Sequence, residues 1–214
     1  MSYGDVALGV EAAFPGSVEF SRKKNPQKKA ILWLIALVAA AGAFQFGQGL
    51  YIHAKAQLAQ LLLERAWQRT LAGETAVKPW PWADTWPVAR VMAPAQHADL
   101  LVLAGANGRS IAFGPGHMDG TPLPGAAGNS VIGGHRDTHL AFLRHVKRGD
   151  RFSVERPDGT RTDYRVTELD VLDKSDTWVT RNEGQTRLTL ITCWPFDALR
   201  AGGPQRYVVI ANKS

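Results

Sequence analysis

The residues that could carry chemistry stand at the ends of three strand-like runs. Cys193 is the only cysteine among the 214 residues, and it ends an apolar run at residues 189–193. His135 follows a second run at residues 129–134, and Arg206 opens a third run at the end of the chain. A thiol, an imidazole and a guanidinium at strand ends can supply a nucleophile, a proton donor and an oxyanion partner. This combination is typical of covalent acyl transfer.

The run before the cysteine has the pattern Thr-Leu-Xaa-Thr-Cys, which resembles the signature of the sortases, a family of cysteine transpeptidases. The histidine pattern of that family matches residues 129–135, and the family arginine falls on Arg206. The resemblance covers residues 87–214. It is closest to the sortases of Gram-negative bacteria, because residues 194–199 (Trp-Pro-Phe-Asp-Ala-Leu) and a tryptophan-rich stretch at residues 79–87 look like that subgroup.

The resemblance implies roles for single residues. Cys193 would attack the threonine carbonyl of a sorting signal similar to Leu-Pro-Xaa-Thr-Gly, and His135 would protonate the leaving amine and later act as a base. Arg206 would stabilise the oxyanion or position the substrate. Thr192 and Trp194, which flank the cysteine, are expected to contact the substrate. The partners would be an exported protein that carries such a signal and an amine acceptor that the sequence does not identify.

Other residues compete for two of these roles. His117, His139 and His145 are alternatives to His135, although the Gly-Gly pair before His135 allows close backbone approach at the strand end. Arg200 is an alternative to Arg206. If the strands on either side of residues 194–205 are adjacent and antiparallel, Cys193 faces Arg206, which favours Arg206.

An apolar segment near the N-terminus predicts a membrane anchor. Residues 30–52 are 23 residues without a formal charge, enough to span about 30 Å of hydrocarbon at roughly 1.5 Å per residue. Five basic residues within residues 22–29 precede this segment, so the N-terminus is expected in the cytoplasm and the rest in the periplasm, anchored in the inner membrane. The competing interpretation is a cleaved signal peptide, because Ala41-Gly42-Ala43 resembles a cleavage site.

The expected organisation has four parts. Residues 1–29 form a disordered cytoplasmic tail, residues 30–52 the transmembrane helix, residues 53–86 a helical stalk and a Trp/Pro-rich linker, and residues 87–214 the catalytic domain. Leu58, Leu61, Leu62, Ala66 and Trp67 recur at helical spacing in the stalk, and Gly73 is its expected end. The tryptophans of the linker are expected to pack it onto the domain, or else to anchor it at the membrane or border a groove.

Short strands separated by turn signals predict a mainly β domain after residue 87, closed or nearly closed into a barrel. The expected strands are residues 88–92, 99–103, 129–134, 151–155, 162–172, 187–193 and 206–211, with a short helix at residues 140–146. The resemblance to sortases makes this an eight-stranded barrel with short helices, preceded by the transmembrane helix and the stalk.

Several other functions are disfavoured. The basic residues gather before the apolar segment and not along a groove, so nucleic acid is not an expected partner. No Cys/His group has metal-ligand spacing, and we expect no metal and no other cofactor. Two rival functions remain. One is a cell-wall cysteine transpeptidase of another class, whose Ser-Xaa-Gly element before the cysteine is missing here, and the other is an exported barrel that binds peptides without turnover.

Overall fold

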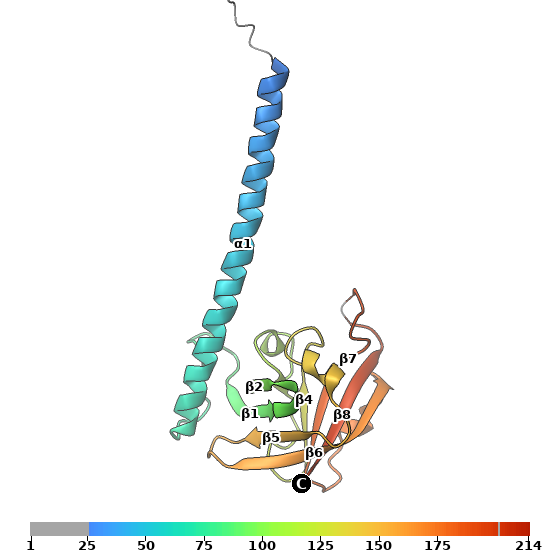
Figure 1. Ribbon diagram of the computed structural model, residues 1–214. Coiled ribbons are helices and arrows are strands. Elements are labelled where there is room, and N and C mark those ends of the chain that lie inside the picture. Colours follow the sequence, from blue (N-terminus) through green and yellow to red (C-terminus); the bar gives the residue numbers. More distant parts are fainter. Residues whose placement is uncertain (1–25, 201) are drawn as a thin grey trace, which may run out of the picture. The chain divides into compact units, whose positions relative to one another are not determined.

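The computed structural model describes residues 26–200 and 202–214. These residues form one long helix, eight strands and four short 3-10 helices (Figure 1). The long helix is α1 (Pro26–Leu71). The strands are β1 (Pro87–Ala93), β2 (Ala98–Ala104), β3 (Gly116–His117), β4 (Asn129–Gly133), β5 (Arg151–Glu155), β6 (Arg161–Asp173), β7 (Arg187–Cys193) and β8 (Gln205–Lys213). The 3-10 helices are η1 (Pro94–Gln96), η2 (Ser110–Ala112), η3 (Ala141–His145) and η4 (Thr177–Thr180).

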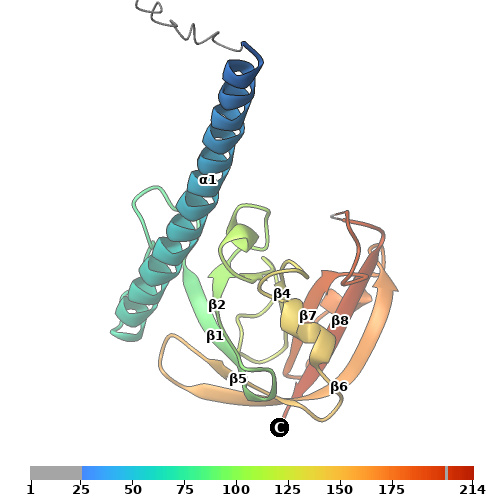
Figure 2. The ribbon, with the colours of Figure 1, turned by 45° about the horizontal axis from the view of Figure 1, so that its top comes forward.

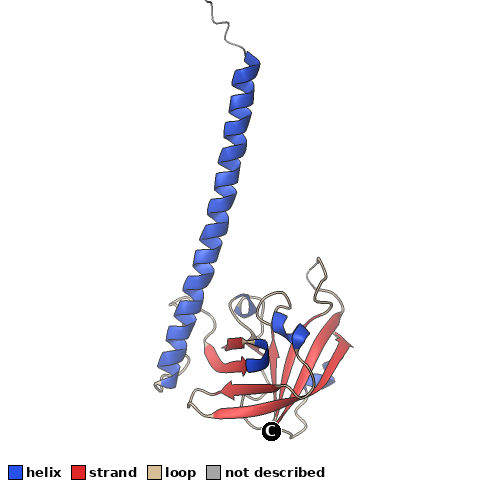
Figure 3. Ribbon diagram, in the orientation of Figure 1, coloured by secondary structure: helices blue, strands red, loops and turns tan. Residues whose placement is uncertain are grey.

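The strands close into a barrel in the order β1-β2-β3-β4-β7-β8-β6-β5. Figure 2 shows the barrel from a second direction. Most neighbours are antiparallel, but β2 with β3 and β4 with β7 are parallel pairs. Within the described residues, helical structure outside α1 consists of the short 3-10 turns between strands (Figure 3). The expected eight-stranded barrel with short helices is therefore confirmed, and η3 matches the helix expected after His135.

The sequence predicted seven of these strands and missed β3. This strand has two residues, too few for an alternating pattern. It exists because Gly116 lies against the backbone of Gly105, where an added Cβ would come within 2.3 Å of the Gly105 carbonyl oxygen. Only glycine allows that approach.

The core of the barrel consists of the apolar side chains that alternate inward along the strands. The largest fully buried ones in the barrel include Phe152, Tyr164, Leu188 and Leu190. In β7 the first four residues are all buried. Apolar residues are interspersed with β-branched threonines along this strand, a composition typical of strands, which is why residues 187–193 could be recognised from the sequence.

The helix α1 continues without a break through the boundary expected at residue 52. The part of α1 from Leu50 onward belongs to the same compact unit as the barrel, Leu50–Ser214. The helix ends at Leu71, and Gly73 follows at a φ of 99°, with its N–H bonded to the carbonyl of Thr70. This agrees with the expected role of Gly73 as a C-terminal stop.

The buried face of the second half of α1 includes two of the five residues that recur at helical spacing, Ala66 and Trp67. Ala59, Leu63, Ala66 and Trp67 are buried, whereas Leu58 and Leu61 are 54% and 49% exposed. Four of the six residues 58–63 are leucines, so hydrophobicity alone does not determine which face of the helix is buried. The buried face is the one that contacts the barrel. The first half of α1 is apolar and exposed, and α1 has the length and composition of a helix that could cross a membrane.

The tryptophans of the Trp/Pro-rich segment do not behave alike. Trp80 packs edge-on against Phe113 with ring centroids 5.0 Å apart, and Trp86 packs against the barrel core. Trp82 is 83% exposed. The expectation that the indoles pack this segment onto the domain therefore holds for two of the three residues.

Candidate active site

Two parallel strands place His135 and Cys193 at the same end of the barrel. Gly133 of β4 pairs with Ile191 of β7, and the N–H of Gly134 donates to the Ile191 carbonyl at 3.2 Å. His135 and Cys193 each lie two residues beyond this pair. Because parallel strands advance at the same rise per residue, the two residues leave the sheet at the same level on adjacent strands.

Buried polar side chains fix the register of these two strands. The Thr189 hydroxyl donates to Oδ1 of Asn129 at 2.7 Å, and the Thr192 hydroxyl donates to the carbonyl of Gly134 at 2.8 Å. Asn129, Thr189 and Thr192 are all at most 2% exposed. A slip by one residue would leave these polar groups buried without partners, which costs about 1–3 kcal/mol for each group.

Cys193 faces Arg206 across the antiparallel pair of β7 and β8. Their Cα atoms are register partners, and beyond them the N–H of Trp194 donates to the Gln205 carbonyl at 3.1 Å. Directly opposed residues of an antiparallel pair project from the same face of the sheet. The strand pairing that favoured Arg206 over Arg200 is therefore confirmed. Arg200 lies in the connection between the strands and is exposed.

The Arg206 guanidinium is held near the start of its own strand. Nη1 donates to the carbonyls of Gly203 and Gln205 at 2.9 and 2.8 Å. Asp173, at the end of β6, lies nearby. Its pKa is lowered mainly by hydrogen bonds from Ser175, and the positive charge of Arg206 contributes to the same shift. Asp173 thus carries a negative charge close to Arg206 at neutral pH.

The other two expected site residues occupy different environments. Thr192 is buried and lies between the two strands, where its hydroxyl is committed to the Gly134 carbonyl. Trp194 is half-buried and stacks on Tyr207, with ring centroids 5.6 Å apart. Of these two, only the Trp194 side chain has surface available to a ligand.

Sequence reasoning did not find the aromatic cluster to which Trp194 belongs. Phe196 packs edge-on against both Trp194 and Tyr207, at 5.6 and 5.3 Å, and the Arg144 guanidinium lies 5.1 Å from the Phe196 ring centroid. Tyr207 joins the cluster because it is the register partner of Thr192. The Trp-Pro-Phe run at residues 194–196 indicated an aromatic group at this position. Its partner Tyr207 could not be identified without the strand pairing.

The competing histidines lie outside the strand ends. His117 is buried in β3 and bonds the Pro122 carbonyl and the Thr121 hydroxyl, whereas His145 is exposed in η3. His139 is half-buried, and burial lowers the pKa of its imidazole. A hydrogen bond to the Ala112 carbonyl opposes this shift, while the charge of His135 adds to it.

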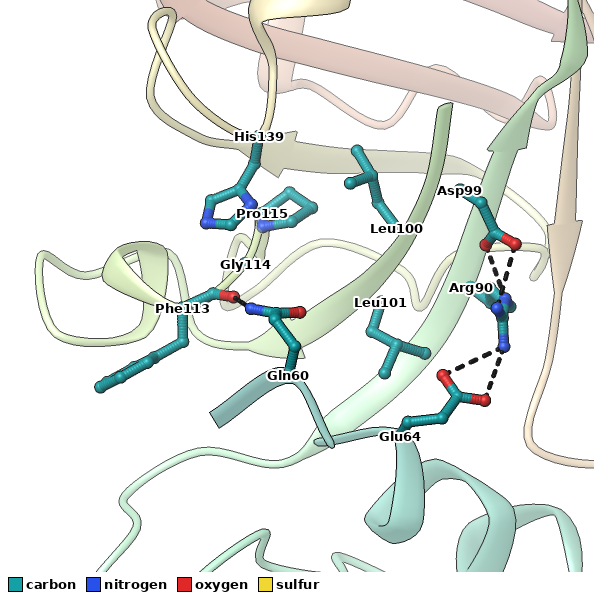
Figure 4. Close-up of a pocket in the computed structure, with 10 residues that line it drawn as sticks. All are labelled: Gln60, Glu64, Arg90, Asp99, Leu100, Leu101, Phe113, Gly114, Pro115 and His139. Carbon is teal, nitrogen blue, oxygen red and sulfur yellow. Dashed lines mark hydrogen bonds and ion pairs between the residues drawn. The ribbon is translucent and has the colours of Figure 1, made fainter. Parts of the chain in front are cut away.

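His139 borders a polar pocket of about 240 Å³ between α1 and β2 (Figure 4). The Arg90 guanidinium bonds Glu64 of α1 at 3.0 Å and Asp99 of β2 at 2.6 Å, and Gln60 donates to the Phe113 carbonyl. The charged groups of this pocket are paired with one another, which ties α1 to the barrel. Across residues 26–200 and 202–214, no three His, Cys, Asp or Glu side chains gather in a way that could hold a metal ion.

The site therefore consists of a half-buried thiol, an exposed imidazole and a half-buried guanidinium at the ends of three consecutive barrel strands. This is the set of groups that acyl transfer through a thioester requires.

Comparison with known proteins gives a consistent result. The family model described as a sortase domain matches residues 91–214. Over 121 residues the chain is 28% identical to sortase D of Bacillus subtilis, an alignment that covers 56% of this chain and 60% of that protein. Over 110 residues it is 31% identical to sortase A of Listeria monocytogenes, covering 50% of this chain and 49% of that protein. The alignments thus span half to three-fifths of these two relatives.

Solved structures show the same fold. Sortase C-1 from Actinomyces oris superposes with a TM-score of 0.53 at 32% sequence identity, over 60% of this chain and 74% of that chain. Sortase A from Corynebacterium diphtheriae superposes with a TM-score of 0.56 over 73% of this chain and 84% of that chain. At 24% identity the second likeness concerns the fold alone.

Proposed function

Because the chain belongs to the sortase family, we propose that it is a membrane-anchored cysteine transpeptidase. It cleaves a C-terminal sorting signal similar to Leu-Pro-Xaa-Thr-Gly after the threonine and transfers the new carbonyl end to an amine. Its partners are an exported protein that carries the signal and an acceptor with a primary amine. The observation that carries the proposal is the register that sets Cys193 opposite Arg206 and level with His135.

In this mechanism Sγ of Cys193, as the thiolate, attacks the carbonyl carbon of the signal threonine. The Thr–Gly amide bond breaks, His135 donates a proton to the leaving glycine nitrogen, and the threonine is left as a thioester on Cys193. The nitrogen of the acceptor amine then attacks the thioester while His135 takes its proton, and Cys193 leaves as the thiolate. Arg206 stabilises the oxyanion of both tetrahedral intermediates or holds the substrate backbone.

Trp194, which is half-buried and directly follows Cys193, contacts the signal peptide in this proposal. Thr192 contributes in a different way. Its hydroxyl is bonded to Gly134, so its contribution is to hold the strand ends and not to contact the peptide directly.

The anchor in this proposal is residues 30–52, with residues 1–29 in the cytoplasm and the barrel in the periplasm. The basic block before the apolar segment supports this orientation. An anchored enzyme meets an anchored substrate on one surface, which raises their effective concentration. The placement in the inner membrane of a Gram-negative bacterium rests on residues 194–199 and the Trp/Pro-rich segment alone. The two relatives do not support it, because they come from the Gram-positive genera Bacillus and Listeria.

The proposal is tested with the full chain in detergent and a synthetic signal peptide. With hydroxylamine as the acceptor, we expect the threonine hydroxamate of the N-terminal fragment, and with water alone slower release of the acid. Cys193→Ala should give neither product, while Asp197→Ala, an exposed change in the following connection, should keep the activity. Binding of the peptide without any product from the wild-type protein would favour the peptide-binding barrel.

A further inference from the structure

Arg136 follows the proposed acid His135 directly, yet its side chain turns inward and is 6% exposed. Each N–H of its Nη2 reaches one backbone carbonyl of the segment between β7 and β8, that of Ala198 at 2.9 Å and that of Arg200 at 2.6 Å. We call this segment, residues 194–204, the β7–β8 connection. Arg136 therefore joins the end of β4 to a segment about sixty residues further along the chain.

Hydrophobic burial contributes little to holding the tip of this connection. Leu199, between the two bonded carbonyls, is fully exposed, and the side chain of Arg200 is also exposed. Among the described residues, the other backbone bond that involves this tip, residues 198–200, is the long contact of 3.4 Å from the Ala198 N–H to the Pro195 carbonyl. The rest of the connection is held separately: the Trp194 N–H donates to Gln205, the Gly203 carbonyl accepts from Arg206, and the Pro204 carbonyl accepts from the Lys174 N–H. The two bonds from Arg136 are thus the main contacts that fix the tip.

A guanidinium suits this task because its donors lie in one rigid plane and remain charged at every relevant pH. Hydrogen bonds from a charged donor are roughly twice as strong as neutral ones. A buried cation whose partners are lost is strongly unfavourable, so the connection and the Arg136 side chain stabilise each other in the closed arrangement.

The connection begins directly after Cys193 and ends directly before Gln205 and Arg206. It also carries Trp194 and Phe196 of the aromatic cluster. A displacement of the connection therefore changes the segment that joins Cys193 to Arg206.

We propose that Arg136 is a positioning residue, which clamps the β7–β8 connection closed and so keeps the border of the peptide-binding site between Cys193 and Arg206 formed. The nature of the ligand, a signal peptide, rests on the proposed function. Arg136 does not touch the reacting atoms, and its loss weakens peptide binding more than it slows the chemical steps.

The test compares the full-length wild-type chain with Arg136→Gln, which removes the buried charge and keeps a single donor amide. Arg148→Ala, an exposed change, controls for the loss of one positive charge. Arg200→Ala removes the side chain but keeps the backbone carbonyl, and it identifies the tryptic cut after Arg200. Three quantities are measured: the rate of that cut in native protein, KM and kcat for the peptide, and the rate at which iodoacetamide alkylates Cys193.

For Arg136→Gln we expect the cut after Arg200 to be at least tenfold faster and KM to rise about tenfold, the range expected from loss of one charge-assisted bond. The decrease in kcat should be smaller than the rise in KM, and alkylation should stay within twofold of wild type. Arg148→Ala should match wild type in all three. A general loss of stability would instead lower the active fraction, and with it kcat, without a selective cut after Arg200.

A folded Arg136→Gln variant with a wild-type cutting rate, or with a wild-type KM, overturns the proposal. Should that variant not fold, Arg136→Lys, which keeps the buried cation but not the planar donor pair, is judged by the same two quantities. If the wild-type protein does not process the peptide at all, the proposed function fails. The cutting rate after Arg200 still decides whether Arg136 clamps the connection.

Discussion

The Thr192 hydroxyl donates a hydrogen bond of 2.8 Å to the backbone carbonyl of Gly134. Thr192 directly precedes Cys193 and Gly134 directly precedes His135. The bond therefore joins the two strand ends at the last position before the proposed nucleophile and the proposed acid. Gly134 has no room for a side chain, since an added Cβ would lie 2.9 Å from Leu140.

Thr192→Val keeps the shape of this buried side chain and removes the hydrogen bond. We expect a loss of about 1–3 kcal/mol in the free energy of unfolding, because the Gly134 carbonyl is left without this partner. Turnover should also fall, because the ends of β4 and β7 are less well held. Urea unfolding and peptide cleavage measure the two effects. Thr177→Val, at an exposed position, is the matched control, and equal behaviour of the two variants would argue against a positioning role for Thr192.

Arg206→Lys keeps the charge but loses the planar pair of donors. Removal of one oxyanion donor typically costs about 10²–10³ in kcat, and we expect a loss approaching this range for Arg206→Lys and the full range for Arg206→Ala. Arg200→Ala should lose much less, because the Arg200 side chain is exposed and the backbone carbonyl that Arg136 bonds is kept. If folded Arg200→Ala were the more damaged variant, the assignment to Arg206 would be wrong.

His139 makes the stability of the domain depend on pH. Its folded pKa lies below the ordinary value of 6.5, mainly because burial disfavours the imidazolium. The unfolded chain therefore binds a proton first, and stability is lost as the pH falls from about 6.5 through the folded pKa. His139→Gln should show a smaller loss of unfolding free energy than wild type between pH 7.5 and pH 5. The neighbouring charges of His135, Glu64, Arg90 and Asp99 remain in both proteins, and an identical loss would refute this role.

The membrane anchor predicts where the mature protein is found and where its chain starts. Fractionated cells should hold the protein in the inner membrane, and the mature N-terminus should precede residue 30. A soluble periplasmic form that begins at Phe44 would show that Ala41-Gly42-Ala43 is a cleavage site. Replacement of the five basic residues within residues 22–29 by glutamine should weaken the orientation, as reported by protease access to the barrel in spheroplasts.

Local patterns were enough to predict the strands that carry the site. The runs at residues 151–155 and 187–193 were predicted with the bounds that the structure shows. Cys193, His135 and Arg206 could also be predicted as site residues, because each stands at an end of a strand-like run. The pairing of Cys193 with Arg206 needed only the assumption that the strands around one connection are adjacent.

Contacts between distant segments could not be predicted in this way. From the sequence alone, Arg136 would be predicted to be exposed to solvent, because the carbonyls to which it donates are more than sixty residues away. The buried face of α1 could not be chosen from the sequence, since hydrophobicity does not say which of several leucines meets the barrel, and Leu58 and Leu61 are exposed. The two-residue strand β3 depends on a close approach between Gly116 and Gly105 that no local pattern records.

The most direct test of the account is the mass of the intact protein during turnover. The full chain is mixed with signal peptide in the absence of an added amine and quenched in acid within seconds. We predict a species heavier by the N-terminal peptide fragment ending in threonine, less one water, with the added mass on the fragment that contains Cys193, and its disappearance when hydroxylamine is added. Cleavage of the peptide at the wild-type rate by Cys193→Ala, or an adduct on any other residue, would contradict the account.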